Sequence, residues 1–199
     1  RAPASLTLAL LLFCIAGLVS YNDAQRRNDM LMAGLSADQI RAQIYQRLND
    51  NRNYLHLLSQ EYLQGQLPAD EFLGRGAQYV NDHPELLNLN RISANLQITN
   101  VTPRKGNAQI LGLSITLAAP LEAALLARET RSPAHTRIFT NIQGRYSFET
   151  WYPIYRGNQF EGLIAAVYDI EKLLEQVVPA TVAERYRVTV EPVEAKQQP

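Results

Sequence analysis

The fold is decided by the segment from Thr136 to Tyr168, which reads TRIFTNIQGRYSFETWYPIYRGNQFEGLIAAVY. It contains three runs rich in β-branched and aromatic residues, which are Thr136–Gln143, Arg145–Tyr155 and Gly162–Tyr168. Residues of these types favour strands. The breaks at Gln143-Gly144 and at Arg156-Gly157-Asn158 are both hairpin signals. The segment therefore predicts a three-stranded antiparallel meander.

Helical patterns lie on both sides of this meander. No glycine or proline interrupts residues 35–64, where apolar residues recur at steps of three, four or seven (Ile40, Ile44, Leu48, Leu55, Leu58 and Tyr62). That repeat predicts one long helix, the main part of a stalk over residues 23–65. Shorter helices are predicted over Ala69–Asp82, Ala119–Glu129 and Ile170–Val178, with one or two strands over Leu86–Val101. The resulting fold class is α+β, an antiparallel sheet with helices against it.

The two ends of the chain carry different patterns. Residues 2–22 contain no charged side chain, and about 20 apolar residues suffice to cross the hydrocarbon core of a membrane. We therefore expect a transmembrane helix over residues 1–22, with everything after it outside the cytoplasm. A cleaved signal peptide is the alternative, because the strongest apolar stretch is short. Residues 181–199 are expected to form a C-terminal strand, around Tyr186–Val190, and a tail, or the start of a second unit cut short.

Composition excludes several functions. The chain has 19 Lys and Arg residues and 19 Asp and Glu residues, so its net charge is zero, which argues against a dedicated nucleic-acid binder. With one cysteine and three histidines at unsuitable spacing, neither a disulfide nor a structural metal site is expected. No nucleophile–base pair is recognisable, so we expect no enzyme activity in this chain, and no cofactor.

Four stretches carry a resemblance to a known group of proteins. His83-Pro84-Glu85-Leu86 leads into the first strand, Tyr152-Pro153-Ile154-Tyr155 ends a central strand, and Gly162–Val167 followed by Asp169–Leu174 gives a last strand with its exit helix. In this order, over roughly residues 36–178, they resemble the PAS-like extracytoplasmic sensor domains of the CHASE and Cache groups.

The resemblance implies a sensor of a bacterial membrane receptor, such as a sensor histidine kinase, diguanylate cyclase or chemoreceptor. Such a domain lies in the periplasm, is anchored in the inner membrane, and holds a small molecule against one face of the meander. No catalytic module follows by Pro199, which is the pattern expected of a fragment.

The register of the first hairpin decides which residues share a face. A two-residue turn at Gln143-Gly144 places Arg137 opposite Thr150 and His135 opposite Tyr152. The same face then carries Phe139, Asn141, Tyr146 and Phe148, whereas Ser147, Glu149 and Trp151 lie on the other face. A three-residue loop would shift this pairing by one residue.

The first face offers groups that suit a small carboxylate. The candidate ligand-binding residues are Arg137, Thr150, Tyr146, Tyr152 and His135. An arginine can grip both carboxylate oxygens, and tyrosine and threonine hydroxyls can donate hydrogen bonds to them. The competing interpretation is that Arg137 only pairs with a nearby carboxylate of the protein.

Three hypotheses of function follow. The first is a ligand-sensing domain that passes its signal through the long helix and the membrane segment, with the long helix also making a homodimer. The second is a membrane-anchored dimerisation or protein-interaction module with no small ligand. The third, an anchored enzyme, would need catalytic residues that the sequence does not show.

Overall fold

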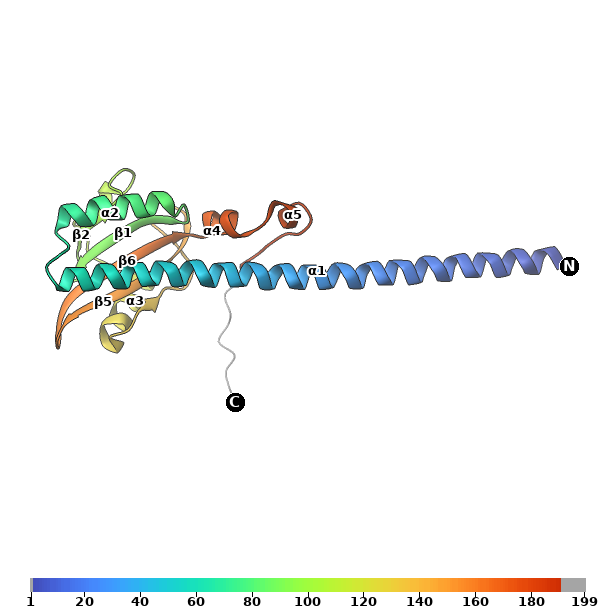
Figure 1. Cartoon of the computed structure of the whole chain (residues 1–199), viewed down its shortest axis with the longest axis horizontal. Coiled ribbons are helices and arrows are strands. Elements are labelled where there is room, and N and C mark those ends of the chain that lie inside the picture. The colour runs from blue at the N-terminus through green and yellow to red at the C-terminus, as the bar shows by residue number, and fades with distance from the viewer. Residues whose placement is uncertain (1, 191–199) are drawn as a thin grey trace.

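The computed structural model describes residues 2–190, with side chains described for residues 13, 15 and 17–190. Its first element is α1 (Ala2–Leu63), a helix of 62 residues that contains the predicted long helix. At a rise of 1.5 Å per residue it is about 90 Å long. Figure 1 shows that only its C-terminal part lies beside the sheet, while the rest extends away from it.

The predicted membrane segment, residues 1–22, lies largely outside the residues whose side chains are described. The backbone of α1 passes through it from Ala2 without a break. Among the residues that were described in full, no helix is both long enough and apolar enough to cross a membrane.

A six-stranded antiparallel sheet forms the centre of the fold. Its strands are β1 (Leu86–Ser93), β2 (Ile98–Thr102), β3 (Ala134–His135), β4 (Phe139–Thr140), β5 (Tyr146–Arg156) and β6 (Gln159–Asp169). They lie in the order β2-β1-β6-β5-β3, and β4 also pairs with β5. The predicted α+β class, with an antiparallel sheet and a long N-terminal helix, is confirmed.

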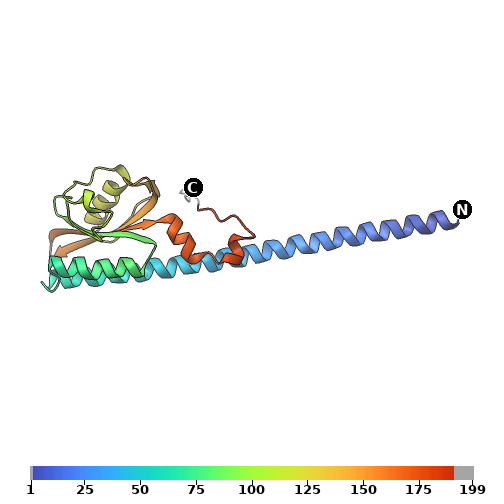
Figure 2. The same cartoon turned by 90° about the horizontal axis from the view of Figure 1, so that it is seen from above.

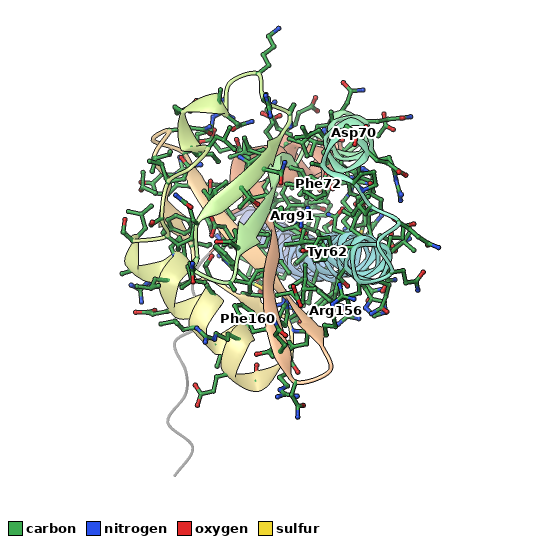
Figure 3. All side chains as sticks on the ribbon, turned by 90° about the vertical axis from the view of Figure 1, so that its left-hand side faces the viewer. Tyr62, Asp70, Phe72, Arg91, Arg156 and Phe160 are labelled. Atoms are coloured by element: carbon green, nitrogen blue, oxygen red, sulfur yellow. The ribbon has the colours of Figure 1, made fainter. Side chains whose placement is uncertain are left out.

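Helices cover the two faces of the sheet unequally. The end of α1 and α2 (Ala69–Asp82) cover one face, whereas α3 (Ala118–Thr130) and the loop before it, with the short helix η1 (Ala108–Ile110), cover the other. Figure 3, viewed along α1, shows the sheet between these two layers. The first face is called the helix face below, and the second the loop face.

Each face of the sheet has its own apolar core. On the helix face, Leu55 and Leu58 of α1 and Phe72 of α2 pack with residues that include Ile154 and Tyr168. Figure 3 shows Phe72 between α2 and the strands. On the loop face, a second core forms around the buried ring of Trp151, with Val101, Ala124, Ala127 and Leu163 among its members.

The first hairpin of the meander differs from the predicted one. The backbone N–H of Asn141 donates to the carbonyl of Arg145 (3.0 Å), so three residues, 142–144, form the loop. The side-chain Oδ1 of Asn141 accepts from the N–H of Gln143 (2.9 Å) and of Arg145 (3.1 Å), which stabilises the wider loop. Gly144 supplies the positive φ (+76°) that a three-residue hairpin needs.

The predicted register is therefore wrong. Phe139 lies opposite Ser147, not Phe148, and His135 lies opposite Thr150, not Tyr152. Of the predicted strand over Thr136–Gln143, only β4 forms, and the short strand β3 precedes it. The second hairpin agrees better with the sequence, because Arg156 pairs with Gln159 across Gly157-Asn158.

The chain leaves the sheet through two short helices, α4 (Ile170–Val177) and α5 (Ala180–Ala183). Residues 184–190 then lie along α1, where Arg185 pairs with Asp29 and the hydroxyl of Tyr186 donates to the carbonyl of Asp29 (3.3 Å). The strand predicted around Tyr186–Val190 does not form: these residues have no strand pairing in the structure.

Candidate ligand-binding cavity

A cavity of about 130 Å³ lies on the loop face of the sheet. Its floor is made by side chains from three neighbouring strands: Asn88 and Asn90 of β1, Val167 of β6, and Glu149 and Trp151 of β5. Its roof is the loop before α3 together with the β4–β5 hairpin. The roof is mainly apolar and includes Ile110, Leu113, Ile115, Leu117, Phe139 and Ile142.

The period of the strands explains why these floor residues meet. Side chains alternate between the two faces of a strand, and neighbouring strands bring their partners into rows. One row across the sheet is Asn88, Val167 and Glu149. The next row has Asn90 and Trp151 on either side of residue Ala165. A small side chain between two larger ones leaves space above the sheet.

A buried asparagine fixes one side of this floor. Asn107, at the start of the roof loop, uses its Nδ2 to donate to the carbonyls of Leu87 (3.3 Å) and Pro103 (2.9 Å). Its Oδ1 is then free to accept from Asn88 Nδ2 (3.0 Å) and from Gln143 Nε2 (2.8 Å). The amide of Asn107 thereby joins the floor, the roof loop and the hairpin at one point.

Glu149 is the acidic group of the cavity. It is only 9% exposed, and its Oε2 accepts a hydrogen bond from the indole Nε1 of Trp151 (2.9 Å). Burial raises the pKa of Glu149 to about 7, although the bond from Trp151 acts in the opposite direction. The carboxyl group of Glu149 therefore changes between its neutral and its charged form near neutral pH.

The side chains that line the cavity include no lysine, arginine or histidine. The nearby Arg145 is paired with Asp169 instead. A buried carboxylate without a cation carries a large desolvation penalty, which is the physical reason for the raised pKa of Glu149. The cavity is thus rich in hydrogen-bond acceptors and lacks fixed positive charge.

The five residues predicted to bind a ligand are not brought together in this cavity. Thr150 is buried on the opposite, helix face, where its hydroxyl meets His135 Nδ1 (3.0 Å). Burial lowers the pKa of His135, and the charge of Arg52 adds to the effect. Tyr152 also lies on the helix face, where its hydroxyl meets His56 of α1.

The other two predicted residues are at the surface. The side chain of Arg137 is 65% exposed and pairs with Glu122 (3.4 Å). The competing interpretation of Arg137 was an ion pair of this kind. Tyr146 is 63% exposed at the start of β5. The alternation along β5 was predicted correctly, because Thr150 and Tyr152 share one face and Glu149 and Trp151 share the other.

Sequence reasoning missed the cavity because it chose the other face of the meander. Alternation shows which residues share a face, but not which face a helix covers. One signal was available in the roof: residues 107–121 contain no charged side chain, although they include a loop. A loop of that length without charge indicates a segment that covers something apolar.

Within the described part of the chain, no metal site competes with this cavity. Across the residues that the structure describes, no three His, Cys, Asp or Glu side chains lie close enough to hold a metal ion. The remaining surface grooves include one between α1 and residues 186–190, lined by Ile40, Ile44 and Val188 among others.

An antiparallel sheet in the order β2-β1-β6-β5-β3, with a long N-terminal helix on one face and a cavity on the other, defines a PAS-like sensory domain. The chain belongs to the CHASE domain family, which it matches over residues 42–198. A CHASE domain is a non-catalytic sensory domain, so this chain is an extracytoplasmic ligand-binding domain of a receptor. The predicted resemblance to this group is confirmed.

Solved structures share the fold at low sequence identity. An extracellular ligand-binding receptor from Desulfohalobium retbaense is 16% identical with a TM-score of 0.58, over 72% of this chain and 26% of that one. The sensory domain of the Campylobacter jejuni chemoreceptor Tlp3 is 14% identical with a TM-score of 0.52, over 74% of this chain and 65% of that one. The same domain has been solved with isoleucine bound.

This chain therefore spans about a quarter of the first structure and just under two thirds of the second. At such identities the likeness concerns the fold alone. No curated protein sequence matches the chain.

Proposed function

We propose that the cavity on the loop face binds a small molecule and that β5 passes the effect of binding to α1. The observation that carries this proposal is the alternation along β5. Glu149 and Trp151 line the cavity, while Thr150 and Tyr152, the residues that alternate with them, lie on the helix face. A ligand that moves the first pair must also move the second, because all four belong to one strand.

The contacts on the helix face favour transmission over passive packing. Tyr152 meets His56 of α1 through its hydroxyl, and Ile154 packs in one core with Leu55 and Leu58. The size of any shift in α1 is limited by the difference in ligand affinity between the two arrangements. The polar contact between Tyr152 and His56 can be either formed or broken, so it can have two discrete arrangements.

The wider setting is proposed from the family. We propose that the domain lies in the periplasm, that residues 1–22 anchor it in the inner membrane, and that the parent receptor is a sensor histidine kinase or a diguanylate cyclase. In this setting α1 leads directly from the cavity-bearing domain toward the membrane, which supports its role as the signalling helix (Figure 1).

The alternative, a dimerisation module with no small ligand, also has an observation in its favour. Several large apolar side chains of α1 are exposed to solvent, among them Met30, Leu31 and Leu35. We propose that these side chains make a homodimer contact along α1. This contact is compatible with ligand sensing, because it lies on α1 beyond the sheet and leaves the cavity free.

Trp151 gives a direct test of ligand binding, because it is the only tryptophan of the chain and lines the cavity. The purified chain is titrated with amines, alcohols, carboxylates and amino acids while its tryptophan fluorescence is recorded. At least one compound is expected to change the emission with a saturating curve. If no compound does so at millimolar concentration, the dimerisation module becomes the better proposal.

A matched pair of variants locates the binding. Leu113 lines the cavity and is half exposed, whereas Leu125 of α3 is equally exposed but lies outside it. Leu113→Phe is expected to fill the cavity and weaken binding at least tenfold, and Leu125→Phe is expected to leave binding unchanged. Equal effects of the two variants would place the ligand elsewhere.

A further inference from the structure

We propose that the cavity on the loop face is selective for a compact amine, with its ammonium group held by Glu149 and the asparagines of β1, and that it rejects carboxylates. This inference rests on the proposed function, since it names the class of ligand for the same cavity. It replaces the small carboxylate expected from the sequence. Three properties of the cavity carry it: its free acceptors, its lack of cations, and its size.

The floor of the cavity presents acceptors that have no donor. Oε2 of Glu149 accepts from Trp151, but within the described residues its Oε1 accepts no hydrogen bond. Asn88 and Asn90 are 3% and 6% exposed, and the Oδ1 of each is buried without a partner among these residues. A buried acceptor without a donor is costly, so a ligand that donates hydrogen bonds gains affinity here.

The orientation of Asn88 follows from its neighbour. The Nδ2 of Asn107 is used by two backbone carbonyls, so its Oδ1 can only accept. Asn88 must therefore turn its Nδ2 toward Asn107, which leaves its own Oδ1 as the unpartnered atom. A rotated amide would set two oxygens against each other. The free group of Asn88 is thus an acceptor on the basis of geometry.

The free acceptors lie on both sides of Val167. Asn88 and Glu149 are its two cross-strand neighbours, and strands in a sheet are about 4.8 Å apart. A ligand nitrogen above Val167 would therefore lie between an asparagine on β1 and a carboxylate on β5. An ammonium group has three N–H donors and a positive charge, and so satisfies both neighbours at once.

A carboxylate finds no positively charged partner in the lining. The lining contains no lysine, arginine or histidine, and the ionised form of Glu149, its one acidic side chain, would repel a second carboxylate. Arg137, the arginine that was expected to bind a carboxylate, is at the surface with Glu122. The cavity therefore disfavours anions for two reasons. It has no cation to pair with them, and its buried acid repels them.

The size and the roof of the cavity restrict the rest of the ligand. A cavity of about 130 Å³ is close to the engineered cavity of about 150 Å³ that holds one benzene molecule. Leu113, Ile115 and Phe139 in the roof offer an apolar surface for a short hydrocarbon group. The ligand is thus a primary amine with a branched chain or a single ring.

The test compares three compounds that share one five-carbon skeleton: isopentylamine, isopentyl alcohol and isovalerate. Each is titrated into the full chain in the millimolar range, with the fluorescence of Trp151 as the readout. Isopentylamine is expected to bind at least tenfold more tightly than the alcohol, and isovalerate is expected not to bind. Tighter binding of isovalerate or of the alcohol, or no binding of isopentylamine, overturns the inference.

A charge-removing variant tests the role of Glu149. Glu149→Gln keeps the size of the side chain and removes its charge, so isopentylamine should bind at least tenfold more weakly while the alcohol changes little. Glu129→Gln, at an exposed position on α3, is the matched control and should bind all compounds as the wild type does. Unchanged amine binding by Glu149→Gln in a folded protein also overturns the inference.

These outcomes are separate from those of the proposed function. If another class of compound binds and Leu113→Phe prevents it, the cavity is a ligand site and only the class of ligand is wrong. If no compound of the broad panel binds, the proposed function itself fails.

Discussion

Burial changes the acid–base behaviour of Glu149. Burial in the cavity raises its pKa from 4.5 to about 7, so the folded chain keeps this proton over a pH range in which the unfolded chain releases it. The folded state therefore loses stability as the pH rises from about 4.5 to about 7. The cost above pH 7 is about 3 kcal/mol, because one pKa unit corresponds to about 1.4 kcal/mol.

Glu149→Gln removes this cost, since glutamine carries no charge at any pH. Urea unfolding should show similar stability for the variant and the wild type near pH 4.5, and a variant that is more stable by up to about 3 kcal/mol above pH 7. The exposed control Glu129→Gln should show no such trend. A difference that stays constant with pH would contradict the raised pKa.

Arg137 provides a second prediction at the scale of single residues. Its side chain is largely exposed and its pair with Glu122 is at the surface, so Arg137→Ala should change the free energy of unfolding by no more than about 0.5 kcal/mol. Ligand affinity, measured by the fluorescence of Trp151, should also stay unchanged. A tenfold loss of affinity would show that the ligand binds on the face of the meander that the sequence predicted.

Among the elements, α2 shows how one glycine sets the distance between a helix and a strand. A Cβ at Gly76 would lie 2.4 Å from Cγ2 of Thr102 in β2. Thr102 cannot turn away freely, because its hydroxyl donates to the carbonyl of Leu73 in α2 (2.7 Å). The glycine therefore allows α2 to approach β2.

Two glycines of α2 form a matched pair for this interpretation. Gly74 faces open space, so Gly74→Ala should stabilise the protein by up to about 1 kcal/mol through helix propensity. Gly76→Ala should destabilise it by roughly 1–3 kcal/mol through overpacking. Thermal unfolding of both variants measures the two effects. The same sign for both would show that α2 does not pack closely on β2.

The elements differ in how far the sequence predicts them. The bounds of α2 agree with the prediction residue for residue, because Pro68 and Pro84 delimit the helix locally. The predicted register of β4 on β5 was wrong, because Asn141 accepts hydrogen bonds within the loop, which is one residue longer than predicted. The cavity on the loop face was not predicted because helix α1 could cover either side of the meander, and only the packed chain decides which.

For the whole molecule, the length of α1 beyond the sheet suggests a homodimer. Leu31 and Leu35 are one helical turn apart and are 67% and 66% exposed. Replacing both by glutamate should convert a dimer into a monomer in light scattering, with no loss of fold, because neither side chain is in a core. The matched control is Leu126→Glu on α3, which should stay dimeric. A monomeric wild type would contradict the proposed dimer.

The central claim is that the loop face of the sheet, not the helix face, receives the ligand. Hydrogen–deuterium exchange tests it most directly, with and without the best-binding compound of the fluorescence panel at saturation. We expect the compound to slow exchange in the roof loop, residues 107–117, and in the hairpin and strand over residues 141–151. Slower exchange confined to α2 and the helix-facing part of α1, with the roof loop unchanged, would contradict the claim.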